Sequence, residues 1–381
     1  MLFICRGVVM HWLIAPDSFK GSLPAARVAA AMAAGLRRAD AQARLTLKPM
    51  ADGGEGTLDV LHSVSGGFWR ECVVHDAAGQ ARTAAYLCLP DGCCVIEVAQ
   101  VVPLADVPPG PALERSSFGV GELMLDALDQ GATHLALALG GSSTNDGGAG
   151  LLLALGARFV DAQGELLRPS PAGLTDLAHV DLSALDQRLA STRIELWSDV
   201  DHPLCGGQGA SAVFGAQKGL TAAEQLAADK VLQRLAVLAG GDALAQQAGA
   251  GAAGGMGWAL LLLGGQRISG AQAVADHTGL AAALREADWV LTGEGASDEQ
   301  TLSGKAPFVV AQLARAAGVP VSLLSGAIRP DPAGRLAASF DGCFSLCSGP
   351  MPLSAAMGQA PALLEQACEQ LARTVLRARR A

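Results

Sequence analysis

Short apolar runs alternate with polar, glycine-rich loops along this chain, and the alternation predicts a sheet covered by helices. The apolar run at residues 12–15 is typical of a buried strand, and a helix is expected over residues 25–38. The alternating segment 44–50 predicts a second strand, and the loop at residues 52–57 precedes an amphipathic helix through residue 64. A strand–loop–helix order that repeats in this way favours a parallel sheet.

The pattern changes in the middle of the chain and then returns. Residues 69–99 contain short β-like runs separated by turn residues, which predicts antiparallel hairpins. Further on, helices are expected over residues 121–130 and 222–239, and strands over residues 135–139 and 194–197. The α/β order then resumes, with strands expected at residues 289–291, 319–324 and 344–346 and helices at residues 307–317 and 360–379.

A chain of 381 residues exceeds the usual size of one hydrophobic core, so we expect two intertwined domains of α/β class. The first is assigned residues 10–65, 114–150 and 281–381 and a mostly parallel sheet. A smaller α+β domain, residues 66–113 and 151–280, is inserted into it. Because Met10 directly precedes the first strand, residues 1–9 are expected to be a non-structural extension.

Composition narrows the function classes. Half of the residues are apolar and 17% are charged, so burial is ample, and a net charge of −9 argues against a nucleic-acid surface. No apolar run approaches the roughly 20 residues that span a bilayer. The nine cysteines include no CxxC pair, which leaves zinc and thioredoxin-like sites unsupported, and we expect reduced, cytosolic thiols.

The loop at residues 140–150 carries the most chemical information. It directly follows the predicted strand at residues 135–139 and combines five glycines with two serines, a threonine, an asparagine and an aspartate. Glycine lets backbone approach a ligand closely, and main-chain N–H groups can hold phosphate oxygens. Other polar clusters also follow predicted strands, at residues 17–20, 52–57, 199–201 and 293–298. Ligands of open α/β sheets bind at the carboxyl ends of strands, so these loops are expected to converge on one cleft, the structural alternative being turns and helix caps.

Several common signatures are absent or out of context. Gly304-Lys305 is followed by Ala306 and lacks the upstream glycine of a P-loop, and residues 249–254 match GxGxxG without a preceding strand. There is no GxSxG or HExxH motif. Glycine loops with Lys20, Lys218 and Lys305 suit phosphate oxygens, and carboxylates suit Mg²⁺. The inventory therefore favours phosphoryl transfer over nucleophilic hydrolysis.

Long motifs in the chain resemble the bacterial glycerate kinase family. They are residues 15–22 (APDSFKGS), 51–57 (ADGGEGT) and 140–150, and later stretches agree, at residues 214–219, 249–257, 292–300 and 304–305. The resemblance extends from residue 10 to the C-terminus. The chain departs from the family pattern at Ala216, where proline is usual, and at Asp201-His202, where Thr/Ser-Asn is usual.

The resemblance implies ATP-dependent phosphorylation of D-glycerate to 2-phosphoglycerate or 3-phosphoglycerate, with ATP and Mg²⁺ as cofactors. It also implies a cytoplasmic enzyme of glyoxylate, glycolate or sugar-diacid breakdown, and two intertwined domains with the active site between them, one of them Rossmann-like with three α/β/α layers. Nucleic-acid and membrane partners are not expected, and a homodimer is considered although no sequence feature indicates one. The alternatives are a kinase for another small hydroxy acid and a non-catalytic metabolite-binding protein on the same scaffold.

Each candidate residue receives a role, and for each carboxylate a cap or a salt bridge is the structural alternative. Asp52 and Asp199 are expected to accept the hydroxyl proton, and Lys20 or Lys305 to neutralise the transferred group. The residues expected to hold ATP are Gly140, Gly141, Ser142, Asn145, Gly147, Gly148, Lys218, Gly254 and Gly255. The metal candidates are Asp146, Glu294 and Asp298, and the substrate candidates are Asp17, Ser18 and Glu55.

Overall fold

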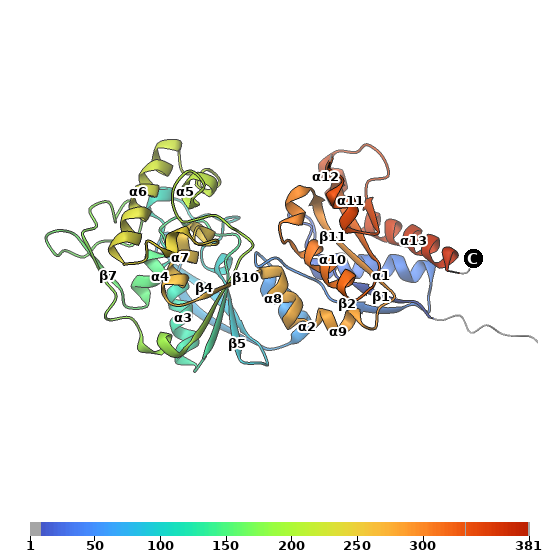
Figure 1. Cartoon of the computed structure of the whole chain (residues 1–381), viewed down its shortest axis with the longest axis horizontal. Coiled ribbons are helices and arrows are strands. Elements are labelled where there is room, and N and C mark those ends of the chain that lie inside the picture. Colours follow the sequence, from blue (N-terminus) through green and yellow to red (C-terminus); the bar gives the residue numbers. More distant parts are fainter. Residues whose placement is uncertain (1–8, 332, 380–381) are drawn as a thin grey trace, which may run out of the picture. The chain divides into compact units, whose positions relative to one another are not determined.

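The chain forms two compact units, and segments from the N-terminal and C-terminal parts of the described chain build the first one (Figure 1). The computed structural model describes residues 9–331 and 333–379, so the predicted extension lies outside the described residues except for Val9. The first unit comprises Met1–Asp52, Asp59–Val64 and Ala271–Ala381, and the second comprises Gly53–Leu58 and Ser65–Gly270. The expected α/β class with mostly parallel sheets is confirmed. Within the described residues, no helix is both long and apolar enough to cross a membrane.

A five-stranded parallel sheet in the order β13-β12-β11-β1-β2 forms the centre of the first unit. Its strands are β1 (His11–Ile14), β2 (Arg44–Leu47), β11 (Trp289–Ser297), β12 (Val321–Ile328) and β13 (Gly342–Ser345). Every residue of β1 is buried, as expected for an inner strand of a parallel sheet. Strand β11 continues to Ser297, well beyond its predicted end, so Gly293 and Glu294 lie within the strand.

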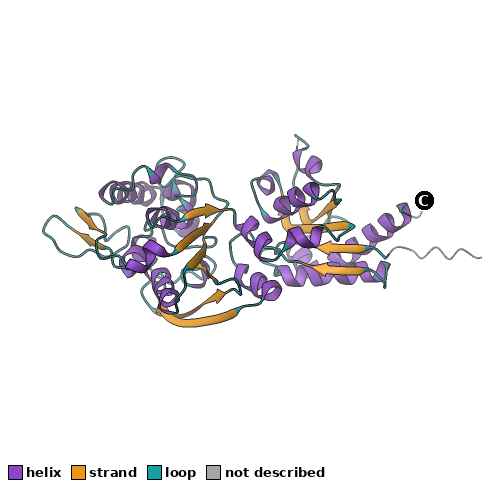
Figure 2. Ribbon diagram, turned by 60° about the horizontal axis from the view of Figure 1, so that its bottom comes forward, coloured by secondary structure: helices purple, strands orange, loops and turns teal. Residues whose placement is uncertain are grey.

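The first unit also contains α-helices (Figure 2). They are α1 (Ala25–Ala39), α8 (Gly270–His277), α9 (Leu280–Leu284), α10 (Ala306–Ala316), α11 (Arg335–Ser339), α12 (Leu353–Gly358) and α13 (Ala360–Ala378). Helix α1 buries Val28, Met32 and Leu36, which recur at the three-to-four-residue spacing of one helix face, and it packs on α13. A Cβ atom at Gly35 would lie 2.2 Å from the Glu365 carbonyl oxygen, so glycine is what allows the two helices to approach this closely.

A six-stranded sheet in the order β10-β9-β6-β5-β4-β3 forms the centre of the second unit. Its strands are β3 (Phe68–His75), β4 (Ala81–Cys88), β5 (Cys93–Glu97), β6 (His134–Ala138), β9 (Arg193–Trp197) and β10 (Gln266–Ile268). Strands β3, β4 and β5 are antiparallel neighbours, which matches the predicted hairpins, and the remaining pairs are parallel. Strands β7 (Arg158–Val160) and β8 (His179–Asp181) form a separate two-stranded sheet.

The structure places residues 114–150 differently from the prediction, which assigned them to the first domain. Strand β6 pairs with β5 on one side and β9 on the other, so it belongs to the second unit together with the loop that follows it. The apolar run of β6 indicates burial but does not specify the neighbouring strand. The inserted unit is therefore the larger of the two, whereas the smaller size was expected.

The helices of the second unit pack around a core that includes the fully buried Tyr86, Phe159 and Trp258. They are α3 (Phe118–Asp129), α4 (Ala149–Ala154), α5 (Ala210–Phe214), α6 (Ala222–Leu238) and α7 (Met256–Leu262), and α2 (Thr57–Ser65) has residues in both units. The Trp258 Nε1–H donates to the Gly241 carbonyl oxygen at 2.9 Å, so its polar atom is satisfied inside the core.

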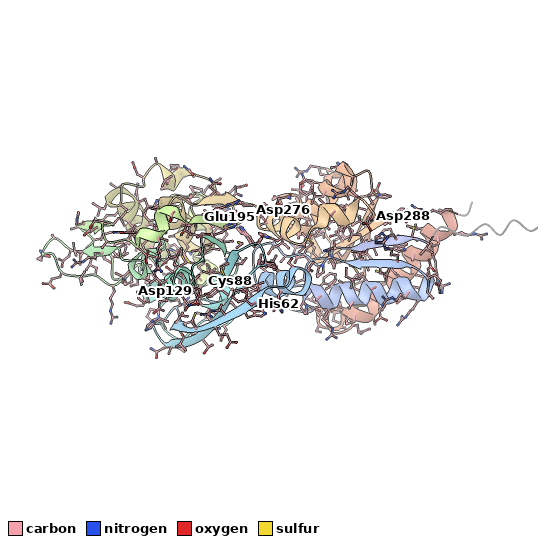
Figure 3. The ribbon with its side chains drawn as sticks, turned by 90° about the horizontal axis from the view of Figure 1, so that it is seen from below. His62, Cys88, Asp129, Glu195, Asp276 and Asp288 are labelled. Atoms are coloured by element: carbon pink, nitrogen blue, oxygen red, sulfur yellow. A yellow bond between two sulfur atoms is a disulfide. The ribbon has the colours of Figure 1, made fainter. Side chains whose placement is uncertain are left out.

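A disulfide joins Cys88 and Cys94 across β4 and β5, which corrects the expectation that all cysteines are reduced (Figure 3). The two residues are direct partners in the antiparallel ladder, and this register brings their side chains into bonding distance. The other cysteines among the described residues are free.

Candidate active site

Three carboxylates and a lysine gather at the carboxyl ends of neighbouring strands in the first unit. Asp17 follows β1, Asp52 follows β2 and Glu294 lies in β11, and these strands are adjacent in the parallel sheet. The backbone N–H of Asp17 donates to the Gly293 carbonyl oxygen at 2.8 Å, which ties the loop after β1 to β11. Lys20 Nζ lies 2.9 Å from Asp52 Oδ2. The predicted association of these residues is therefore observed within this unit.

The Asp17 carboxyl group is the most strongly perturbed member of this cluster. Its side chain is only 5% exposed, and Oδ1 accepts a hydrogen bond from the Ser18 backbone N–H at 2.6 Å. Burial raises the pKa of Asp17 to about 8, the Asp52 carboxylate adds to this, and Lys20 partly offsets it. A carboxyl group that titrates near neutral pH is suited to exchanging a proton with a substrate hydroxyl.

Glu294 is held by a buried hydroxyl network. Its Oε1 accepts hydrogen bonds from Ser297 Oγ at 2.9 Å and from Thr301 Oγ1 at 2.6 Å, and Ser297 Oγ lies 2.7 Å from Ser325 Oγ. Burial raises the pKa of Glu294, while Thr301 and the nearby Lys305 act in the opposite direction. Lys305 stands at the N-terminal boundary of α10. Glu294 is thus oriented by side chains that leave its second oxygen without a bond to Ser297 or Thr301.

Asp298, predicted as a metal ligand, caps a short helix. Its Oδ1 accepts from the Gln300 N–H at 2.9 Å, and Thr301 Oγ1 accepts from the Asp298 N–H at 3.1 Å, which forms a capping box at Glu299–Leu302. In the part of the chain that the structure describes, no three His, Cys, Asp or Glu side chains are grouped so as to hold a metal ion.

In the second unit, Asp146 shapes the loop that follows β6. The side chain is fully buried and accepts four hydrogen bonds, from Ser117 N–H at 2.7 Å, Ser117 Oγ at 2.8 Å, Gly148 N–H at 3.2 Å and Gly150 N–H at 3.1 Å. Burial raises the pKa of Asp146 and these donors counteract the effect. Asp146 therefore holds the turn through these hydrogen bonds, and its role as a metal ligand stays a prediction.

The loop glycines serve close backbone packing. A Cβ atom at Gly140 would lie 2.4 Å from the Gly54 Cα atom, one at Gly148 would lie 2.4 Å from the Ala259 Cβ atom, and one at Gly254 would lie 2.0 Å from the Thr144 carbonyl oxygen. The N–H of Gly140 donates to Gly53, and that of Gly147 donates to Gly254. These N–H groups were expected to face phosphate, and the structure engages them within the protein instead. Gly255 likewise packs closely on Gly147.

Two buried cations contact the same loop. Lys218 Nζ donates to Ser142 Oγ at 3.1 Å and to the Thr144 carbonyl oxygen at 2.7 Å. Burial lowers the pKa of Lys218 to about 7. Arg115 Nη1 donates to the Lys218 carbonyl oxygen at 2.6 Å. Arg115 was not among the predicted site residues, because no motif in its sequence neighbourhood indicates that it lies beside Lys218.

The remaining predicted residues of the second unit are Asn145, Glu55 and Asp199. Asn145 Nδ2 donates to Ser211 Oγ at 2.8 Å, and the exposed Glu55 lies beside Gly141. Asp199 is partly exposed and follows β9 by two residues.

Two positions where the chain departs from the family pattern have local roles. His202 Nδ1 lies 3.0 Å from the Gln208 carbonyl oxygen, and Ala216 begins the short helix Ala216–Lys218.

Comparison with known proteins assigns the chain to a family. A model of the glycerate kinase family matches residues 12–376. A glycerate kinase of Halalkalibacterium halodurans is 39% identical, and the match covers 94% of this chain and 97% of the relative. The glycerate 2-kinase of Escherichia coli K12 is also 39% identical, with 84% and 86% covered. The crystal structure of a Salmonella typhimurium LT2 protein assigned to the glycerate kinases is 38% identical, with a TM-score of 0.85 and coverage of 98% of this chain and 100% of that one. The chain therefore belongs to the glycerate kinase family.

Proposed function

We propose that the protein transfers the γ-phosphoryl group of ATP to a hydroxyl group of D-glycerate, giving 2-phosphoglycerate or 3-phosphoglycerate. The relatives named glycerate kinase and glycerate 2-kinase support this substrate class. The observation that carries the proposal is the cluster of Asp17, Lys20, Asp52 and Glu294 at the carboxyl ends of adjacent parallel strands. Such strand ends are where open α/β sheets place their ligands.

The chemistry requires a proton acceptor and neutralisation of negative charge. When the glycerate O–H bond breaks and the new O–P bond forms, the proton passes to a carboxylate, and Asp17 and Asp52 are the candidates. Lys20, already paired with Asp52, balances the charge that accumulates beside these carboxylates. ADP leaves with the electron pair of the broken phosphoanhydride bond. Phosphoryl transfer depends mainly on positioning and charge neutralisation, which this set of groups can supply.

Mg²⁺ is proposed to arrive with the ATP phosphates. This ion commonly binds through one or two carboxylates together with substrate phosphates, so a complete protein cage is not needed. Asp146 and Asp298 are engaged in hydrogen bonds that shape the backbone, and Glu294 is the carboxylate suited to it, through the oxygen that Ser297 and Thr301 leave without a bond. Bound there, the ion would neutralise phosphate charge.

The proposal is tested by incubating the full-length protein with MgATP and D-glycerate and following ADP release in a coupled assay. A panel of other small hydroxy acids distinguishes D-glycerate from rival acceptors. ADP release that depends on D-glycerate supports the proposal, and release that depends on another acid of the panel would reassign the substrate. No release with any acid, over a range of pH and divalent metals, would favour a non-catalytic metabolite-binding protein. The homodimer, the cytoplasmic location and the catabolic pathway stay predictions.

A further inference from the structure

Arg115 and Lys218 are buried cations whose hydrogen-bond partners are all neutral. Their residues are 8% and 4% exposed. Arg115 Nη1 contacts the Lys218 carbonyl oxygen, and Lys218 Nζ contacts the Ser142 hydroxyl and the Thr144 carbonyl oxygen. Neither cation takes part in an ion pair with another described residue. Buried charges in proteins are normally paired, because desolvation of an isolated charge is very unfavourable.

Asp146 is the carboxylate that acts electrostatically on Lys218, but the two side chains do not form an ion pair. Its oxygens accept the four hydrogen bonds from Ser117, Gly148 and Gly150 that shape its own loop. Two cations are thus buried beside one carboxylate. The charge balance of this region favours the binding of a further anion.

Buried polar atoms without a hydrogen-bond partner also favour an anion here. Arg115 Nε and Thr144 Oγ1 are buried and have no hydrogen-bond partner, and an ammonium group has three protons, of which Lys218 uses two. Asn145 Oδ1, an acceptor, is also without a partner. Orphaned buried groups of this kind call for a water or a ligand. Three donors and one acceptor suit an oxyanion that can carry a hydroxyl group.

We propose that Arg115 and Lys218, together with the hydroxyl groups of Ser142 and Thr144, form a binding site for a tetrahedral oxyanion of the phosphate class. The inference deepens the proposed function, and only the identification of this oxyanion with a phosphate group of ATP rests on that function. Free inorganic phosphate and a phosphorylated product carry the same chemistry.

The test measures binding of inorganic phosphate to the full chain by calorimetry. Lys218→Met and Arg115→Met each remove one proposed donor. Arg188→Met is the matched control, because Arg188 lies in the same unit and is exposed and paired with Asp129 and Asp186. Phosphate is expected to bind the wild type and the control equally, and each of the other variants at least tenfold more weakly. Equal binding to all four proteins would overturn the proposal.

Stability in phosphate-free buffer separates ligand binding from a purely structural role. If Lys218 serves to bind an anion, Lys218→Met removes an unpaired buried charge. The unfolding temperature of the variant then equals or exceeds that of the wild type, and phosphate no longer raises this temperature. If Lys218 only stabilises the loop through its hydrogen bonds, the unfolding temperature of the variant falls and phosphate still raises it. That result would overturn the proposal.

A wild-type measurement keeps the proposal testable if a variant does not fold. Sulfate has a constant charge between pH 6 and pH 9, whereas the pKa of Lys218 is about 7, set by burial with Asp146 and Arg115 as the charged groups facing it. Sulfate binding should weaken at least tenfold over this range as the ammonium group loses its proton. Binding that is independent of pH would contradict a site built on Lys218.

Competition identifies the source of the oxyanion. ATP should displace phosphate from the wild type, and adenosine should not. If ATP binds without displacing phosphate, the identification with a nucleotide phosphate is wrong. A wild type that binds phosphate through Lys218 but phosphorylates no hydroxy acid contradicts the proposed function alone. Unimpaired kinase activity and phosphate binding in both variants contradict the present inference alone.

Discussion

The ammonium group of Lys20 lies 2.9 Å from the Oδ2 atom of Asp52, so the loop after β1 is joined to the segment after β2. The Lys20 side chain is 72% exposed, and ion pairs of this kind contribute only about 0–1 kcal/mol to stability. Desolvation of its ammonium group beside these carboxylates would lower the pKa of Lys20, but the charges of Asp52, Asp17 and Glu294 outweigh it and raise the pKa. The pair is therefore better suited to balancing charge at the proposed site than to stabilising the fold.

Lys20→Met should abolish most of the activity and preserve the fold. We expect kcat with D-glycerate and MgATP to fall by about 100-fold or more, because an electrostatic contact to the transferring group is lost. The thermal unfolding midpoint should change little. Arg373→Met is the control, since Arg373 forms an exposed pair with Glu369 on α13, and it should change neither quantity. Near-normal turnover of Lys20→Met would remove this lysine from the mechanism.

Asp17→Asn should change how stability depends on pH. Because the pKa of Asp17 is raised from 3.8 to about 8, the folded state retains a proton that the unfolded state releases between these values. Its contribution to the free energy of unfolding is therefore lost progressively as the pH rises through this window. Asparagine mimics the protonated form, so the variant should gain stability relative to the wild type from pH 5 to pH 8. Urea unfolding at several pH values measures this, and a constant difference would contradict the burial of an uncharged Asp17.

Asp146→Asn should destabilise the second unit without a selective effect on Mg²⁺. The amide supplies one acceptor oxygen where four donors now bind, and leaving buried donors unpaired costs at least about 2 kcal/mol. Asp298→Asn is the comparison, because asparagine caps helices about as well as aspartate. Thermal unfolding and a Mg²⁺ titration of kcat distinguish the two roles. An unchanged midpoint with a raised Mg²⁺ requirement would restore Asp146 as a metal ligand.

Gly254→Ala should destabilise much more than Gly264→Ala. Both glycines have positive φ, +69° and +84°, but an added Cβ at Gly254 would lie 2.0 Å from the Thr144 carbonyl oxygen, whereas nothing lies within 4 Å at Gly264. The backbone penalty of about 1 kcal/mol is shared, and the clash adds about 1–3 kcal/mol at Gly254 alone. Equal unfolding free energies of the two variants in urea would show that the loop after β6 accommodates the added Cβ atom without loss of stability.

The positions of strands and loops could be predicted from local pattern because each depends on nearby residues. The apolar run of β1 and the polar residues after it place Asp17 at a strand end, and the alternating pattern of the second strand places Asp52 after it, although β2 itself ends at Leu47. Strand pairing is not local. The run of β6 is equally apolar whichever sheet it joins, so the assignment of residues 114–150 to the first domain was wrong.

The roles of loop residues depend on contacts across long sequence separations. Asp146 is a turn former because Ser117 donates to it twice, and Gly254 is required because Thr144 lies against it. Arg115 comes beside Lys218, more than 100 residues later, only through the fold. A glycine that approaches backbone and one that approaches a phosphate look identical in a sequence, so the sequence could not show that the N–H groups of Gly140 and Gly147 donate to protein carbonyl oxygens.

The most direct test of the proposed activity is phosphorus NMR of the full-length protein with MgATP and D-glycerate. A glycerate kinase should cause loss of the ATP γ-phosphate signal, appearance of ADP signals and one new phosphomonoester signal that matches 2-phosphoglycerate or 3-phosphoglycerate, which also identifies the hydroxyl group attacked. Unchanged ATP signals across a range of pH values and divalent metals, with protein shown to be folded, would contradict the proposed glycerate kinase activity.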